Sequence, residues 1–261
     1  MTKLRKHGSK IFMALVLLFI YAPILSMVIF SFNENKSLTR WGGFSFQWYE
    51  KLFDSQEIMG AVTMTILIAV VSTLISTIIG TFAALSLSKS KKLVKDIILT
   101  ANNVPIVNPE IVTAVGLLLL FVSFQLPRGY LTMLLAHIAF SIPYVIITVY
   151  PKVRSLDPNL AEAAKDLGAT PLQALRLVVF PEIKVAVIAG AAIAFTMSFD
   201  DFVISYFTAG SATNISIYLY TLKRGIEPTI NALSTIIIVV IGLIVTRNFM
   251  KTKKIQQESE E

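Results

Sequence analysis

The sequence predicts an all-α integral membrane protein with six transmembrane helices. Its 261 residues are 55% hydrophobic, and the mean hydropathy is +0.71, which is far too apolar for a soluble domain of this length. Several apolar stretches reach the roughly 20 residues that a helix needs to cross the hydrocarbon core of a bilayer. The basic residues gather in alternate connections between these stretches, as expected of a chain that crosses a membrane repeatedly.

Six apolar segments, separated by charged residues, Pro or Gly, are expected to span the membrane. They cover roughly residues 11–32, 61–87, 97–124, 130–150, 185–208 and 230–249. Because backbone polar groups in lipid must be satisfied internally, each segment is predicted to be a helix. The first has no small-residue cleavage pattern and is therefore interpreted as a retained helix rather than a signal peptide. We expect residues 1–261 to form one transmembrane domain, with a disordered charged tail over 251–261.

The distribution of Lys and Arg predicts the orientation. Of the 23 basic residues, 17 lie on one side, in the N-terminus, the connections 88–96 and 151–184, and the tail. The remaining 6, among them Lys223 and Arg224, fall on the other side. Since basic residues accumulate on the cytoplasmic side, both termini are predicted to be cytoplasmic. The net charge of +7 is then a topology signal, and a nucleic-acid partner is not expected.

Several kinds of chemistry are excluded by composition. Cysteine is absent, which rules out disulfides and thiolate sites, and the two histidines are too few for a metal cluster. His137 is expected to be a hydrogen-bonded core residue. No phosphate-binding Gly-x-x-x-x-Gly-Lys-Ser/Thr motif occurs, so energy from ATP would have to come from another protein. No nucleophile–base pair suggests an intramembrane enzyme, and no cofactor is expected.

The connection 151–184 is long for a membrane protein of this size. Asp157 and Pro158 suit the start of a helix, and leucines and alanines then recur at helical spacing. Gly168 is placed to end that helix, after which Thr170 and Pro171 can start a second one. We therefore predict a helix-turn-helix with small residues at Ala163 and Ala164, where another protein can approach closely.

This pattern resembles the EAA loop of binding-protein-dependent ABC importer permeases. The residues that carry the resemblance are Glu162, Ala163, Ala164, Gly168 and Pro181. Val178 and Phe180 replace the usual Ile and Leu before Pro181, and both keep apolar character. The resemblance implies a type I importer permease in the bacterial inner or plasma membrane. It also implies two cytoplasmic ATPase subunits that bind ATP and Mg and dock on this loop.

Acidic residues inside predicted spans cost free energy in the bilayer and therefore indicate a functional site. Three qualify, namely Glu110 in the third span and Asp200 and Asp201 in the fifth, and neither span contains Lys or Arg. In the fifth span, Ser198, Asp201, Ser205 and Thr208 fall at helical spacing and form one polar stripe, which favours Asp201 over Asp200 as the pathway-facing acid. The alternative left open is that the two aspartates cap a broken helix and that Glu110 starts a helix half near its positive dipole end.

The third span is expected to contribute to the same pathway. Asn103 and Glu110 lie seven residues apart and would share a helix face. Pro105 and Pro109 are expected to interrupt this helix beside a cavity. Tyr144 and Tyr206 would add aromatic faces that attract cations.

Three acids without basic partners predict a cation as the substrate, and separated carboxylates suit a polyamine. The segment Ser198–Phe207 also resembles the fifth span of spermidine/putrescine permeases, in particular the second of their two related permease subunits. That resemblance implies a polyamine substrate, a homologous permease partner and an extracytoplasmic polyamine-binding protein. Two alternatives stay open: an ABC permease for another solute, and a secondary transporter driven by an ion gradient. For the second, which would need no ATPase, we find no convincing internal repeat.

Overall fold

The computed structural model describes residues 3–157, 159–222 and 228–258, and in this part of the chain the structure is almost entirely helical. Five helices are long and apolar enough to cross a membrane, and one further pair of bent helices passes the same test together. The bent pair takes the place of the predicted third span. The fold class expected from the sequence is therefore confirmed. Pro158, Lys223 and Arg224 lie outside the described residues.

The chain divides into two compact units. The first unit, Met1–Met59 with Leu222–Glu261, contains α1 (Lys3–Phe30), α2 (Gln47–Asp54) and α12 (Pro228–Glu258), and α12 packs against both α1 and α2. Helix α12 continues to Glu258, so the expected disordered tail is helical over 251–258, where Lys, Gln and Glu are all good helix formers. The prediction of a single domain stays a prediction.

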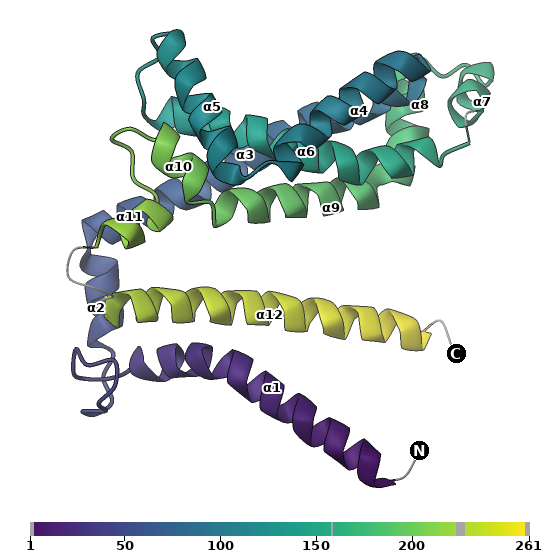
Figure 1. The fold of residues 1–261 in the computed structure, drawn as a ribbon. Coiled ribbons are helices and arrows are strands. Elements are labelled where there is room, and N and C mark those ends of the chain that lie inside the picture. The colour runs from purple at the N-terminus through teal and green to yellow at the C-terminus, as the bar shows by residue number, and fades with distance from the viewer. Residues whose placement is uncertain (1–2, 158, 223–227, 259–261) are drawn as a thin grey trace. The chain divides into compact units, whose positions relative to one another are not determined.

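The second unit, Gly60–Thr221, holds every residue predicted to contact substrate or an ATPase. Its helices are α3 (Gln56–Lys89, which begins before the unit), α4 (Lys92–Val107), α5 (Glu110–Ser123), α6 (Tyr130–Arg154), α7 (Leu160–Asp166), α8 (Pro171–Ala174), α9 (Phe180–Phe199), α10 (Val203–Thr208) and α11 (Ile215–Thr221). Figure 1 shows α9 running alongside α6, and this pair makes the most extensive helix–helix contact described.

Helices α3, α6 and α9 share one apolar core. Ala84 of α3, Val145 and Val149 of α6, and Ile183 and Ala194 of α9 are all buried in it. In a bilayer, helices associate through close packing and small residues rather than through a hydrophobic driving force. The alanines in this core, together with Gly80 of α3, are such residues.

Gly80 of α3 packs closely against Val145 of α6. A Cβ atom at Gly80 would lie 2.7 Å from the Cβ and Cγ1 atoms of Val145, whereas a Cβ atom at Gly116 of α5 would meet no atom of the described residues within 4 Å. We expect Gly80→Ala to lower the free energy of unfolding by about 1–3 kcal/mol through overpacking. Gly116→Ala should be neutral or slightly stabilising because Ala is the better helix former. Thermal unfolding of the purified protein in detergent checks both, and equal melting temperatures would contradict the close packing of α3 on α6.

The predicted third span is broken at Asn108 and Pro109. The axes of α4 and α5 are bent by 108° relative to each other, as the two helices in Figure 1 show. Pro109 disfavours the helical conformation of the residue before it, and Asn108 is extended, with ψ 147°. Pro105 lies inside α4 without ending it, so only one of the two predicted interruptions is observed. Asn103 and Glu110 consequently lie on different helices and share no face.

The predicted fifth span is also interrupted, so the expectation of one continuous polar stripe is wrong and the alternative of a broken helix is observed. Helix α9 ends at Phe199 and α10 begins at Val203, so Asp200 and Asp201 lie in a short non-helical segment, Asp200–Phe202, which we call the acidic break. Ser198, Asp201, Ser205 and Thr208 are therefore not one stripe on a continuous helix. The physical reason is local, because the Asp201 side chain bonds to backbone N–H groups of the next turn and ends the helix that precedes it.

Candidate functional site

The acidic break is set by the hydrogen bonds of Asp201. Its Oδ1 atom accepts from the backbone N–H of Ile204 at 3.1 Å, and Oδ2 accepts from that of Ser205 at 2.8 Å. Both carboxylate oxygens thus satisfy N–H groups in the first turn of α10, which have no partner within the helix. Asp201 is 4% exposed. Asp201 therefore serves as a buried helix cap.

Asp200 has the opposite environment. It is exposed, and no ion pair involves it among the described residues. The burial of the two aspartates thus reverses the order expected from the helical wheel, because the chain turns between them instead of continuing as a helix. Of this pair, Asp200 is the carboxylate accessible to a solute.

Glu110 lies beside the same break. It is the first residue of α5, where the helix dipole favours a negative charge, and it is half-buried. Helix α10 packs against α5, and Glu110 interacts electrostatically with both Asp201 and Asp200. The structure therefore brings together the three acids selected from the sequence, although they come from two broken spans.

Aromatic rings surround one side of the acidic break. Phe202 and Tyr206 have ring centroids 5.3 Å apart, and Tyr220 of α11 lies 4.7 Å from Phe202 and 5.6 Å from Tyr206. Tyr206 is 47% exposed and Tyr220 66%. Exposed aromatic faces attract an ammonium group, and these rings adjoin the two aspartates through Phe202.

The remaining predicted pathway residues differ in their burial and in their contacts. Tyr144 interacts electrostatically with Glu110 and packs edge-on against Phe140. Asn103 is exposed on α4. Ser205 is fully buried and bonds to His137 and Asn214, so it supports the break without facing a solute. Sequence reasoning missed Phe202 and Tyr220. Phe202 adjoins the two aspartates in sequence, whereas no spacing pattern relates Tyr220 to them.

The connection between α6 and α9 has the predicted helix-turn-helix form. Asp157 accepts from the backbone N–H of Asn159 at 2.9 Å, just before α7, and Gly168 follows α7 with a φ angle of +87°. The N–H of Ala169 bonds to the carbonyl of Ala164, and that of Gly168 to the carbonyl of Lys165, a pattern typical of a helix that ends in a left-handed glycine. The predicted role of Gly168 in ending this helix is confirmed.

The second half of this connection is continuous with the fifth span. Residues from Pro171 to Phe199 form one helical stretch, with a π-helical turn over Leu175–Val179 that ends two residues before Pro181. Pro181 has no N–H for the carbonyl of Leu177, and its ring would clash there in a regular α-helix. A π turn accommodates such a residue, and π turns are frequent at functional sites.

Apolar side chains on this connection are strongly exposed. Leu167 is 90% exposed, and Leu172 and Leu177 also lie open to the surroundings. Ala164, Leu167, Gly168 and Leu177 border a shallow groove. None of the residues of α7 is buried. An exposed apolar patch of this kind marks an interaction surface.

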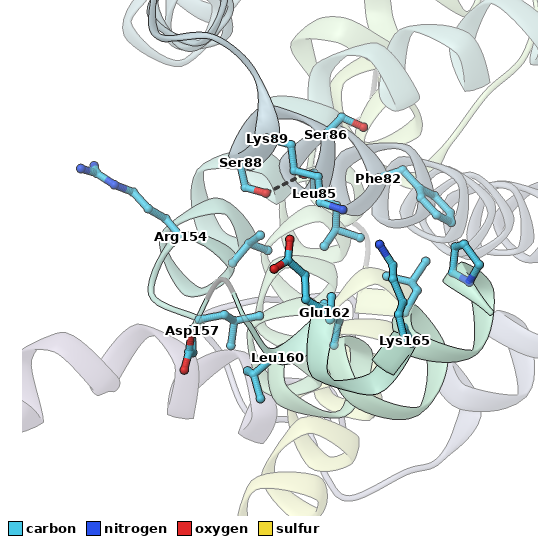
Figure 2. Close-up of a pocket in the computed structure, with 17 residues that line it drawn as sticks. Phe82, Leu85, Ser86, Ser88, Lys89, Arg154, Asp157, Leu160, Glu162 and Lys165 are labelled. Atoms are coloured by element: carbon cyan, nitrogen blue, oxygen red, sulfur yellow. Dashed lines mark hydrogen bonds between the residues drawn. The ribbon is translucent and has the colours of Figure 1, made fainter. Parts of the chain in front are cut away.

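A second hollow, with a volume of about 620 Å³, lies between this connection and the ends of α3 and α6. Figure 2 shows the Glu162 and Lys165 side chains extending from α7 toward the end of α3, where Lys89 lies, while Arg154 points away. No ion pair joins these groups among the described residues. The connection therefore presents charged as well as apolar side chains at its surface.

The fold and these two regions define the class of the protein: a multi-pass transport permease with an exposed helix-turn-helix on one side of the membrane. Residues 76–252 match the family described as binding-protein-dependent transport system inner membrane component, and the chain belongs to this family. It is therefore a permease of an ABC importer rather than an enzyme.

Two curated relatives are polyamine permeases. The chain is 38% identical to the putrescine transport system permease protein PotI of Escherichia coli K12, over 87% of this chain and 84% of that protein. It is 35% identical to the spermidine/putrescine transport system permease protein PotC of Haemophilus influenzae, over 93% of this chain and 95% of that protein.

Solved structures support the same fold. A chain of a bacterial ABC transporter that imports the acidic polysaccharide alginate superposes with a TM-score of 0.75 over 96% of both chains, at 14% identity. A chain of the alginate transporter in complex with an alginate-bound periplasmic protein gives a TM-score of 0.68 over 93% of this chain and 91% of that one, at 18% identity. At these identities the likeness shows the fold of an ABC importer permease.

Proposed function

We propose that this permease forms half of the translocation pathway of an ATP-driven polyamine importer. The observation that carries the proposal is the exposed Asp200 carboxylate, which interacts electrostatically with half-buried Glu110, in a segment whose Phe202 packs on the exposed rings of Tyr206 and Tyr220. A polyamine bears several ammonium groups along a flexible chain, and carboxylates and aromatic faces both bind such groups. The names of the relatives, which are putrescine and spermidine/putrescine permeases, support the same substrate class.

The proposed partners follow from the family and from the missing phosphate-binding ATP motif in this sequence. One homologous permease subunit would complete the pathway, and an extracytoplasmic binding protein would deliver the polyamine. Two cytoplasmic ATPase subunits would bind ATP and Mg and dock on the connection around Glu162, Ala163, Ala164 and Gly168. This places the termini and the helix-turn-helix on the cytoplasmic side, which agrees with the distribution of Lys and Arg.

The mechanism proposed is alternating access driven from this docking surface. Closure of the ATPase pair moves α7, and the continuous helical stretch from Pro171 to Phe199 carries that motion to the acidic break. Because the break lies at the end of this stretch, a shift of α9 changes the surroundings of Asp200. The polyamine released by the binding protein then passes the carboxylates of Asp200 and Glu110, with Asp201 holding the local geometry.

The test is uptake of radiolabelled spermidine and putrescine in a host strain that lacks this gene and its other polyamine importers. We expect the wild-type gene to restore uptake and Asp200→Asn to raise the KM of uptake about tenfold, equivalent to about 1.4 kcal/mol of lost binding. Glu110→Gln should have a smaller effect in the same direction, since it is half-buried. Asp54→Asn in α2, which changes another exposed Asp, is the matched control.

Two outcomes would contradict the proposal. If the wild-type gene restores no polyamine uptake, the substrate is another solute. If wild type transports polyamines but Asp200→Asn and Glu110→Gln both keep the wild-type KM, the acidic break is not on the pathway.

A further inference from the structure

His137 lies fully buried in the N-terminal third of α6, and both of its ring nitrogens have partners. Nδ1 lies 2.7 Å from the hydroxyl of Ser198, in the last turn of α9. Nε2 lies 2.9 Å from the hydroxyl of Ser205, in α10. These two serines are on opposite sides of the acidic break. A single side chain therefore joins both halves of the interrupted fifth span to α6.

The two bonds belong to a larger buried network. The Ser198 hydroxyl also lies 3.0 Å from the hydroxyl of Ser72 in α3, and Ser205 accepts from Nδ2 of Asn214 at 2.8 Å. Nε2 of His137 is also 3.4 Å from Oδ2 of Asp201, the cap of α10. The ring thus lies at the centre of contacts that connect α3, α6, α9, α10 and the residue that precedes α11.

The geometry of imidazole explains why a histidine suits this position. In the neutral ring one nitrogen donates and the other accepts, and a serine hydroxyl can play either matching role. The two nitrogens sit at fixed positions of a rigid ring, so the separation of the two serines is fixed as well. Away from water, breaking such bonds leaves unsatisfied polar groups, which is costly.

The residues next to the two anchoring points are those that face a solute. Asp200 follows Ser198 by two positions, and Tyr206 follows Ser205 directly. Both are exposed, whereas Ser198, Asp201 and Ser205 are buried. The position of the exposed pair is therefore set by the buried atoms that bond to His137.

We propose that His137 is a positioning residue of the transport pathway, which joins α9 to α10 across the acidic break and so holds Asp200 and Tyr206 toward the cation. This goes beyond the role of a core histidine, and it rests on the proposed polyamine function only for its transport consequence. The alternative is that the ring merely fills space between helices.

Two substitutions separate these roles. His137→Gln keeps one donor and one acceptor at the end of its side chain, whereas His137→Phe keeps a ring of similar shape without polar atoms. Ser141→Ala is the matched control, because Ser141 lies one turn away on α6, is fully buried, and its hydroxyl has no hydrogen-bond partner among the described residues. Removing that hydroxyl breaks no bond that the described part of the chain contains.

The first measurement uses the absence of native cysteine. Ile204, in α10, is fully buried, so Ile204→Cys supplies one protected thiol whose rate of reaction with N-ethylmaleimide reports local opening. In the assembled transporter, we expect His137→Phe to increase this rate about tenfold or more, as expected for a locally destabilised segment. His137→Gln should restore most of the protection, and Ser141→Ala should not change the rate.

The second measurement is polyamine uptake by the same His137 and Ser141 variants without the reporter cysteine. We expect His137→Phe to raise KM by more than it lowers maximal uptake per inserted subunit, and His137→Gln to recover the wild-type KM. If His137→Phe keeps the wild-type labelling rate and the wild-type KM, the ring only fills space and the proposal is wrong. If the wild type takes up no polyamine, the proposed function fails, while the labelling result still decides whether His137 joins the two helices.

Discussion

Replacing Gly168 by Leu is expected to abolish net uptake, by about 100-fold or more, while leaving the subunit inserted. The φ angle of +87° at Gly168 lies outside the range that side chains with a Cβ atom readily adopt, and the left-handed conformation costs such residues roughly 1–2 kcal/mol. To avoid this strain the turn after α7 must change its path. The carbonyls of Ala164 and Lys165 then lose the backbone bonds that now end the helix.

The size of the effect on transport comes from the position of this turn. Gly168 and its neighbours Leu167 and Ala169 border the exposed groove on the proposed docking surface. No atom would meet a Cβ at Gly168 within 4 Å, so the substitution changes the conformation of the loop without clashing with the rest of the described chain. The membrane part should remain folded while the contact with the ATPase is lost.

Uptake and ATP hydrolysis of the reconstituted importer should be measured together. We expect Gly168→Leu to retain hydrolysis but to lose its stimulation by the loaded binding protein. Gly168→Asn is the matched control, because Asn tolerates the left-handed conformation better than other residues with a Cβ atom, and it should keep part of the uptake. Normal uptake by Gly168→Leu would contradict the docking role of this turn.

Replacing Asp201 by Ala is expected to lower the free energy of unfolding by about 2–4 kcal/mol, because two buried N–H groups would lose their acceptors. The affected donors are those of Ile204 and Ser205. Asp200→Ala should cost far less, within about 0.5 kcal/mol, as expected for a surface position. The two adjacent aspartates thus differ in surroundings, since Asp201 is buried and bonds to the backbone of α10, whereas Asp200 is exposed.

Thermal unfolding in detergent, measured beside polyamine uptake, distinguishes these roles. Asp201→Ala should lower both the melting temperature and the amount of inserted subunit. Asp200→Ala should keep the melting temperature and raise the KM. Asp201→Asn retains one acceptor oxygen and should fall between wild type and Asp201→Ala in stability. Equal stability of the Asp200→Ala and Asp201→Ala variants would show that the cap does not support the break.

Much of this fold could be predicted from the sequence because the lipid bilayer restricts which structures can span it. Apolar stretches must be helices, and basic residues mark their ends, so the fold class and the position of the helix-turn-helix could be predicted. Gly168 was also identifiable, since glycine is the residue that most readily ends a helix in the left-handed conformation. The three acids were found because charges are rare within spans.

Only the tertiary structure shows which of these residues are buried and which lie together, because helical spacing alone gives the wrong answer where a helix is broken. A helical wheel assumes a continuous helix. The interruption of the third span at Pro109 was predictable from the sequence, whereas Asp201 ends α9 by bonding forward to the backbone of α10, which a wheel does not show. Asp201 therefore became buried and Asp200 exposed, the reverse of the expected order. His137 is unremarkable in sequence, because its partners Ser198 and Ser205 lie more than 60 residues away. Such a site depends on which buried polar groups meet, and only the packing of α6 against α9 and α10 brings them together.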